Sequence, residues 1–324
     1  MTKIRSRDAS RVQDRRGQGG GGLSGGLGDL LNGGLRRGGG GGLPIPGGSG
    51  GLGSLLKGGG GLVALLVVAA VFFLPKLLGG ATGSLGGAPP VAGEPAGSSG
   101  DTAAGANDDA CSTELEQIVC GATNDVADYW VEQLPTSFGV EYVETETVFF
   151  SGYTNTGCGQ ASSQTGPFYC PLDNLVYFDL EFLVQLQQSF GATGDLAAQY
   201  IVAHEYGHHV QNVLGINEEV RRAQQSDPQR ANQYSVALEL QADCFAGAWA
   251  SDVAARGLFD TPEEIEEALA AAAAVGDDAI QQKTQGRVDP ESWTHGSSAQ
   301  RVEWFSRGYR TGDPQRCTTF SEVL

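Results

Sequence analysis

Apolar residues recur at helical spacing between residues 195 and 213. They are Leu196, Tyr200, Ile201, Val210 and Val213. Asp195 is the predicted N-cap of this segment, and Gly215 is a stop signal shortly after it. The pattern predicts an amphipathic helix that buries one of its faces.

Other patterns flank this helix. Upstream, Thr113 and Glu116 form a capping box for a helix that is expected to end before Pro135. Residues 142–150 and 175–178 are rich in aromatic and β-branched residues, which favours strands. An exposed edge strand can pair with an extended peptide, and residues 174–178 are the candidate for that role; an ordinary core strand is the alternative.

Helices are expected to dominate the remainder of the chain. A Thr-Pro-Glu-Glu sequence at 261–264 starts a helix that continues through the alanines of 268–274. Ser297 or Ser298 is expected to cap a last helix that ends near Gly308. The predicted fold class is therefore α+β, a mainly helical domain with a small sheet.

The N-terminal third follows a different pattern. Residues 62–74 are continuously apolar, and the uncharged stretch 58–75 is about the shortest that spans a bilayer. We interpret residues 58–78 as one transmembrane helix, with a buried core helix as the alternative. A cleaved signal peptide is disfavoured because about sixty residues precede the apolar run.

Composition divides the chain around this segment. Residues 1–57 are basic and glycine-rich, and they are expected to form a disordered arm because ordering so many glycines costs too much entropy. Residues 79–109 form a linker of Gly, Ala, Ser and Pro. Residues 110–324 are the predicted folded domain, long enough to bury one substantial core.

Charge is distributed unevenly between the two ends. Residues 1–60 carry nine Lys or Arg against three Asp or Glu, a net charge of +6, whereas the chain after Lys76 carries ten against 35, a net charge of −25. The basic residues before the apolar run are Arg5, Arg7, Arg11, Arg15, Arg16, Arg36, Arg37 and Lys57, besides Lys3. They predict a cytoplasmic N-terminus, a single-pass membrane protein, and an acidic domain outside the cytoplasm. The basic arm also suits contact with anionic lipid, whereas the acidic domain argues against nucleic-acid binding.

All six cysteines follow the apolar run, on the side where an oxidising compartment permits disulfides. Their spacing favours the pairs Cys111–Cys120, Cys158–Cys170 and Cys244–Cys317, among fifteen connectivities that six cysteines allow. Zinc ligation is the competing use of cysteine, but the chain has no Cys-x-x-Cys pair.

The predicted helix that follows Asp195 carries the sequence His-Glu-x-x-His at residues 204–208. Residues four apart lie on one helical face, so His204 and His208 can bind one metal ion, and Glu205 is placed to act on a water. Two solvated histidines are the alternative interpretation. His209 lies roughly 140 degrees around the helix from His204 and should not bind the same ion.

A catalytic zinc ion needs a third protein ligand. Glu239 is the best candidate, because it and Asp243 share one face of an otherwise apolar helix, and buried charges are rare unless they are paired or bind metal. Asp243 would then accept a hydrogen bond from the outer ring nitrogen of a ligand histidine, expected to be His204. A solvated acidic stripe is the alternative, and Asp227 is the reserve ligand.

Oxyanion stabilisation needs a further group. His295 is the remaining histidine and is a candidate catalytic residue that stabilises the tetrahedral intermediate. Arg301 or Tyr234 is the alternative for that role, and a purely structural role for His295 is also open.

Three segments together resemble a known family. They are AHEYGHHVQ at 203–211, ELQADCFAG at 239–247 and THGSSAQR at 294–301, and the DRRG sequence at 14–17 resembles the start of the same family. The resemblance is to the neutral zinc metallopeptidases predicted in bacteria, which are membrane-tethered and pair His-Glu-x-x-His with Glu-x-x-x-Asp as gluzincins do. It covers residues 108–320 and implies a zincin-like domain with one Zn²⁺ ion. The glycine-rich insertion after residue 17 departs from the family pattern.

These observations predict a membrane-anchored zinc metalloendopeptidase of the cell envelope that hydrolyses protein or peptide substrates. Zinc held by His204, His208 and Glu239 would lower the pKa of a water to about 7, and Glu205 would act as general base. A noncatalytic, zinc-stabilised envelope scaffold or binding module is the alternative. It would need a closed site with four ligands, in which Glu205 has no use.

Overall fold

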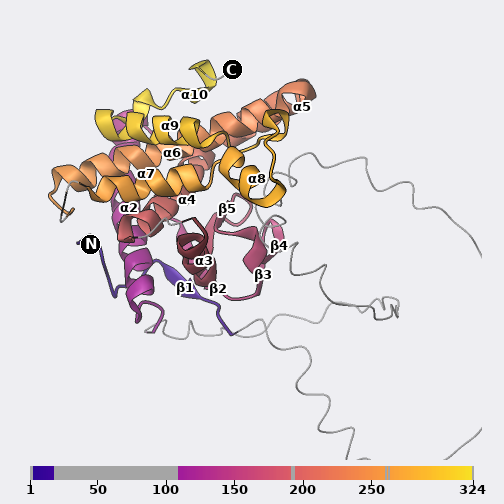
Figure 1. Ribbon diagram of the computed structural model, residues 1–324. Helices are drawn as coiled ribbons and strands as arrows, with labels where there is room; N and C mark the ends of the chain where they lie inside the picture. Colours follow the sequence, from indigo (N-terminus) through magenta and orange to yellow (C-terminus); the bar gives the residue numbers. More distant parts are fainter. Residues whose placement is uncertain (1–2, 18–108, 191–193, 260, 262, 323–324) are drawn as a thin grey trace, which may run out of the picture.

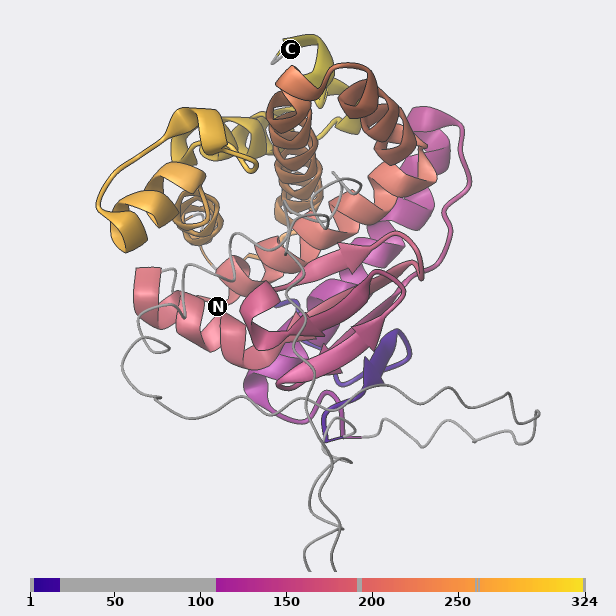
Figure 2. The ribbon, with the colours of Figure 1, turned by 90° about the vertical axis from the view of Figure 1, so that its right-hand side faces the viewer.

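The computed structural model describes residues 3–17, 109–190, 194–259, 261 and 263–322, and in them helices pack on one side of a small sheet (Figures 1 and 2). The strands are β1 (Val12–Asp14), β2 (Glu146–Phe150), β3 (Tyr153–Thr156), β4 (Gly159–Ser162), β5 (Phe168–Cys170) and β6 (Leu175–Asp179). The α-helices are α2 (Glu114–Phe138), α3 (Leu180–Phe190), α4 (Asp195–Val213), α5 (Ile216–Ser226), α6 (Ala231–Ala255), α7 (Glu264–Ala274), α8 (Asp277–Gln285), α9 (Ser298–Thr311) and α10 (Thr319–Glu322). The predicted α+β class is confirmed.

Helix ends agree with the capping signals better than with the stop signals. The capping box of Thr113 and Glu116 starts α2, and Ser297 caps α9. The expected stop before Pro135 is wrong: α2 continues to Phe138, because a proline there removes only one donor and Leu134 beside it is fully buried. Helix α9 likewise passes Gly308 and ends at Thr311, before a left-handed glycine.

The main sheet has the order β1-β2-β6-β5, with β2 parallel to both neighbours and β5 antiparallel to β6. Strand β6 is therefore an interior strand, and the prediction that residues 174–178 pair with substrate at an edge is wrong. Strand β5 forms the edge instead, beside α4. The strand predicted from residue 142 begins only at Glu146.

Helices α6 and α9 cross at backbone contact. A Cβ atom added to Gly308 would lie 1.9 Å from the carbonyl oxygen of Cys244, and one added to Gly247 would lie 2.0 Å from that of Phe305. Only glycine permits this approach. The close crossing brings Arg301 of α9 to Asp243 of α6, with the Arg301 Nε atom 2.7 Å from the carboxylate.

Replacing Gly308 with alanine should lower the free energy of unfolding by about 1–3 kcal/mol, because the added methyl overpacks this crossing. Alanine is the better helix former, so helix propensity alone predicts the opposite sign. Denaturant unfolding measures the difference. Arg310→Ala, on the exposed side of the same helix, is the control and should change stability by less than about 0.5 kcal/mol; a stabilised Gly308→Ala variant would contradict the crossing.

The N-terminal residues 3–17 pack against the domain. Ile4 and Val12 are 6% and 2% exposed, and β1 pairs with β2. The expectation of a disordered arm over residues 1–57 is therefore wrong for residues 3–17. Residues 18–57, the predicted transmembrane segment 58–78 and most of the predicted linker 79–109 lie outside the described residues. No helix within the described part of the chain is long and apolar enough to cross a membrane.

Arg16 of this N-terminal segment forms an ion pair with the buried Glu116 of α2. Burial by itself raises the pKa of Glu116, but hydrogen bonds from Thr113 and Arg16 outweigh it and lower the pKa to about 2. A depressed carboxyl pKa stabilises the fold above the ordinary value of 4.5, and this contribution is lost as the pH falls toward 2.

We therefore expect wild type to exceed Glu116→Gln in stability at pH 5 by a margin on the order of 3 kcal/mol, and this margin should shrink steadily between pH 4.5 and 2. Denaturant unfolding of both proteins, in the presence of chelator, measures the difference. A margin that stays constant with pH would show that Glu116 keeps an ordinary pKa in the folded protein.

The three disulfides are Cys111–Cys120, Cys158–Cys170 and Cys244–Cys317. The pairing predicted from spacing is confirmed. The last bridge joins the segment after α9 to the middle of α6, four residues beyond Leu240. Beside it, the Gln241 side chain of α6 donates a hydrogen bond to the carbonyl oxygen of Cys317 at 2.9 Å.

Candidate metal centre

Helix α4 carries the His-Glu-x-x-His sequence and is buried on almost every side, from Leu196 to Gln211. The prediction of a half-buried amphipathic helix is therefore wrong, because α2, α6, α7 and β5 all pack around it. Asp195 is not the N-cap either. The first turn is instead bound from outside: Glu267 of α7 accepts from the Leu196 N–H at 3.1 Å, and Arg5 pairs with Asp195 at 2.6 Å.

Three candidate metal ligands meet where α4 approaches α6. The His204 Nε2 atom lies 3.2 Å from one carboxylate oxygen of Glu239, and the His208 Nε2 atom lies 3.5 Å from the other. Their donor atoms all lie within 4.8 Å of one another. Gly207 permits this approach, since a Cβ atom there would sit 3.1 Å from the Ala242 backbone.

The Nδ1 atoms of His204 and His208 each have a hydrogen-bond partner, and their Nε2 atoms face the Glu239 carboxylate. His204 Nδ1 lies 2.9 Å from Asp243, as expected for a group that orients a ligand histidine. His208 Nδ1 lies 2.9 Å from the side-chain oxygen of Gln211, which the sequence reasoning missed. The signal was present, because a residue three positions on shares the helical face of His208. The Gln211 amide donates in turn to Gln241, at 3.1 Å.

Asp243 is also the centre of a buried ionic network. Its carboxylate accepts from Arg301 at 2.7 and 2.8 Å and from the Tyr200 hydroxyl at 2.5 Å. Burial raises the pKa of Asp243, but the charges of Arg301 and His204 outweigh it and hold the pKa below its ordinary value. Although burial lowers the pKa of His204, Asp243 and Glu239 raise it to about 9. The guanidinium of Arg301, an alternative oxyanion donor, is thus engaged by Asp243.

Glu205 lies beside these donors and is only 7% exposed. Burial raises the pKa of its carboxyl group, and the neighbouring imidazoles oppose that rise. A raised pKa makes a carboxylate a stronger base, which suits it to accept a proton and return it. Glu205, His204, His208 and Glu239 all line one cavity of about 560 Å³.

His295 lines the same cavity from the loop before α9. Its Nδ1 atom lies 3.2 Å from Asp277 of α8, and the Asp277 carboxylate also accepts from the backbone N–H groups of Thr294, His295 and Gly296. The loop is therefore wrapped around one carboxylate that also orients the imidazole. Asp277 was missed because nothing in the local sequence connects it to His295.

The other candidates lie elsewhere. His209 is fully buried and donates from Nε2 to the carbonyl oxygen of Val143 at 2.6 Å, a structural role. Asp227, the reserve ligand, precedes a short 3-10 turn between α5 and α6 and is outside the group of converging donors. Tyr234 packs its ring beneath Arg230, 5.8 Å from the guanidinium carbon, and does not line the cavity.

Two histidines one helical turn apart and a glutamate from a second helix are the donor set that zinc peptidases of the His-Glu-x-x-His type use, and the buried acid between the histidines is their general base. The family comparison agrees with this class. The family model described as "Putative neutral zinc metallopeptidase" matches residues 1–320, so the chain belongs to this zinc peptidase family.

Relatives extend the comparison without adding an activity. The uncharacterized protein YpfJ of Escherichia coli (strain K12) is 46% identical over 212 residues, which cover 65% of this chain and 72% of that protein. The uncharacterized protein Rv2575 of Mycobacterium tuberculosis is 49% identical over 213 residues, which cover 63% of this chain and 70% of that protein. The search of solved structures finds no significant match.

Proposed function

We propose that the protein is a zinc-dependent endopeptidase that hydrolyses peptide bonds of protein or peptide substrates. The observation that carries this proposal is the convergence of His204, His208 and Glu239 beside the buried Glu205, in one cavity. The donor set fits Zn²⁺, since imidazole nitrogen and carboxylate oxygen are its usual ligands and both Nε2 atoms face the same carboxylate. A zinc ion bound there supplies Lewis-acid chemistry, acidifying water and polarising a peptide carbonyl.

The side chains divide the remaining work. Glu205 accepts a proton from the attacking water and returns it to the departing amine nitrogen. His295, held by Asp277, stabilises the negative charge that develops on the carbonyl oxygen. Asp243 and Gln211 fix the orientation of the two ligand histidines.

The cavity favours peptides with an apolar side chain next to the cleaved bond. The apolar residues that line it include Phe182, Ile201, Leu238 and Val275. Burying a large apolar side chain there contributes about 1.5–3 kcal/mol. The alternative of a noncatalytic zinc scaffold is less well supported, because a structural zinc site is closed, with four protein ligands, and these donors face a cavity.

We also propose that the domain of residues 110–324 works outside the cytoplasm, in the cell envelope, with membrane contact through residues 58–78. Three disulfides use all six cysteines, and such bonds persist in oxidising compartments. The acidic charge of the domain argues against nucleic acid as a partner.

The proposed function predicts zinc-dependent hydrolysis of a peptide library by the purified full-length protein. Cleavage products identified by mass spectrometry should carry large apolar residues beside the new termini. Chelation should abolish cleavage, and one equivalent of Zn²⁺ per chain should restore it. A protein that binds one zinc ion tightly and cleaves nothing would support the scaffold alternative; a protein that binds no zinc would contradict both.

A further inference from the structure

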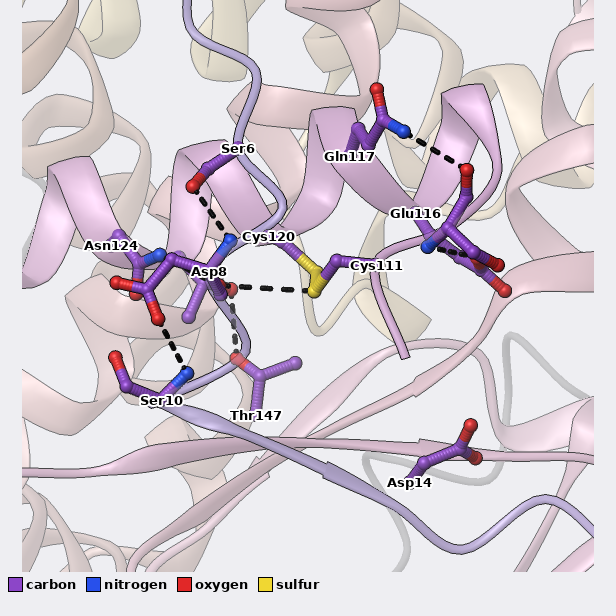
Figure 3. Close-up of a disulfide and its surroundings, with 12 residues drawn as sticks. Ser6, Asp8, Ser10, Asp14, Cys111, Glu116, Gln117, Cys120, Asn124 and Thr147 are labelled. Atoms are coloured by element: carbon purple, nitrogen blue, oxygen red, sulfur yellow. Dashed lines mark hydrogen bonds between the residues drawn. A yellow bond between two sulfur atoms is a disulfide. The ribbon is translucent and has the colours of Figure 1, made fainter. Parts of the chain in front are cut away.

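The N-terminal segment, defined as residues 3–17, is bound to the domain along its whole length. Val12–Asp14 form β1 and pair with Thr147–Phe149 of β2. The Ser6 N–H donates to Gln117 O at 3.0 Å, and the Thr147 N–H donates to Arg11 O at 2.8 Å. In Figure 3 the Asp8 backbone lies against Cys111 of the first disulfide, and its carbonyl accepts from Asn124 at 3.0 Å.

Helix α2 has a site shaped for this segment. A Cβ atom added to Gly121 would lie 2.8 Å from the Arg5 Cα atom and 2.9 Å from the Ile4 carbonyl carbon. Any other residue at position 121 would collide with the backbone of the segment. A glycine in the middle of a helix costs stability, and here the close contact with residues 4 and 5 accounts for it.

Basic residues of the segment are paired with acids of the domain. Arg5 contacts Glu114 and Asp195, Arg11 contacts Asp128 and Glu144, and Arg16 contacts Glu116. These three arginines belong to the group that predicted a cytoplasmic N-terminus. Their charges serve to bind the segment to the acidic domain, which removes much of the basis for that orientation.

The segment also contacts α4, which carries two of the candidate ligands, and the chain just after α6, which carries the third. The Gln199 side chain of α4 donates to Ile4 O at 2.7 Å in the interior, five residues before His204. The Lys3 N–H donates to Leu258 O, three residues after the end of α6, at 2.9 Å.

We infer that residues 3–17, with β1 at Val12–Asp14, are a structural part of the metal-centre domain and lie with it on the same side of the membrane. A single crossing by residues 58–78, with the N-terminus in the cytoplasm and the domain outside, is incompatible with this docking. The inference does not depend on the peptidase activity.

Paired cysteines test the docking in the full-length protein in its own membrane. Gln13 and Val148 are register partners in β1 and β2. Adjacent strands lie about 4.8 Å apart, within reach of a disulfide. With a protease site inserted among residues 79–108, the N-terminal fragment of Gln13→Cys/Val148→Cys should remain attached to the domain under non-reducing conditions. The control pair Gln13→Cys/Gln225→Cys should release it.

Labelling of single cysteines shows on which side of the membrane the segment and the domain lie. Arg7→Cys and Gln225→Cys, both at exposed positions, should react equally with a membrane-impermeant maleimide on intact cells. Labelling of residue 225 alone, without cross-linking of residues 13 and 148, would overturn the inference. Protection of both residues in intact cells would keep the inference and overturn the proposed export.

A variant outside the segment completes the test. Gly121→Ala should reduce cross-linking of residues 13 and 148 several-fold, because the methyl displaces the backbone of residues 4 and 5. Glu132→Ala, at an exposed position of the same helix, should leave cross-linking unchanged. Equal cross-linking in the two variants would show that the contact at Gly121 does not hold the segment.

Discussion

Glu205→Gln is expected to lower kcat for peptide hydrolysis by about 10²- to 10⁴-fold while zinc binding is retained. Glutamine preserves the size of the side chain but cannot accept a proton from water or return one to the leaving nitrogen. The substitution should be tolerated structurally, because Glu205 is buried at the wall of a cavity and a neutral amide is cheaper to bury than a carboxylate.

Steady-state kinetics on a peptide selected from the library, together with zinc analysis of the same samples, measures this effect. The matched control is Glu181→Gln on the exposed side of α3, which should hydrolyse the peptide at the wild-type rate. Retention of activity within a few-fold in Glu205→Gln would remove Glu205 from the mechanism. Loss of zinc together with activity would instead assign it a role in binding the metal.

Arg301→Leu is expected to lower the free energy of unfolding by about 3–5 kcal/mol, because it removes the guanidinium that forms two hydrogen bonds with the fully buried Asp243 carboxylate. Denaturant unfolding of the chelated protein isolates this effect from the contribution of bound zinc. The double variant Asp243→Asn/Arg301→Leu should recover part of the loss, since no unpaired charge remains buried.

Zinc titration of the double variant separates the two roles of Asp243, which pairs with Arg301 and orients His204. Without the carboxylate that orients His204, zinc affinity should be about 10- to 100-fold below wild type even where stability is recovered. The losses of stability in Asp243→Asn and Arg301→Leu should not add up to the loss in the double variant. Strict additivity would contradict the network, because only independent groups have additive effects.

The candidate ligands could be predicted because each leaves a local signature. His204 and His208 stand one turn apart, and Glu239 is a charge on an apolar helix. Their convergence depends on Gly207, which brings α4 and α6 together; no local pattern predicts that contact. Asp277 illustrates the limit more clearly, because it reaches His295 through a loop that closes only in the folded chain.

The sequence predicted the fold class, but it did not predict the order of the strands. Capping boxes and apolar periodicity located the helices, since both are local effects. The order of strands is set by long-range pairing, so the interior position of β6 had no local signature. The expectation for residues 3–17 was wrong because the glycine-rich composition belongs to the residues that follow them; Ile4 and Val12 are buried apolar anchors, and Val12 begins β1.

The carboxyl-terminal tail is connected to a candidate metal ligand through side-chain hydrogen bonds. From the Cys317 carbonyl, two consecutive amide side chains, Gln241 and Gln211, lead to the outer nitrogen of His208. The Cys244–Cys317 disulfide fixes the position of the Cys317 carbonyl, where this series of hydrogen bonds begins. Reduction of the Cys244–Cys317 disulfide is therefore expected to loosen the series of hydrogen bonds that orients the His208 imidazole on α4.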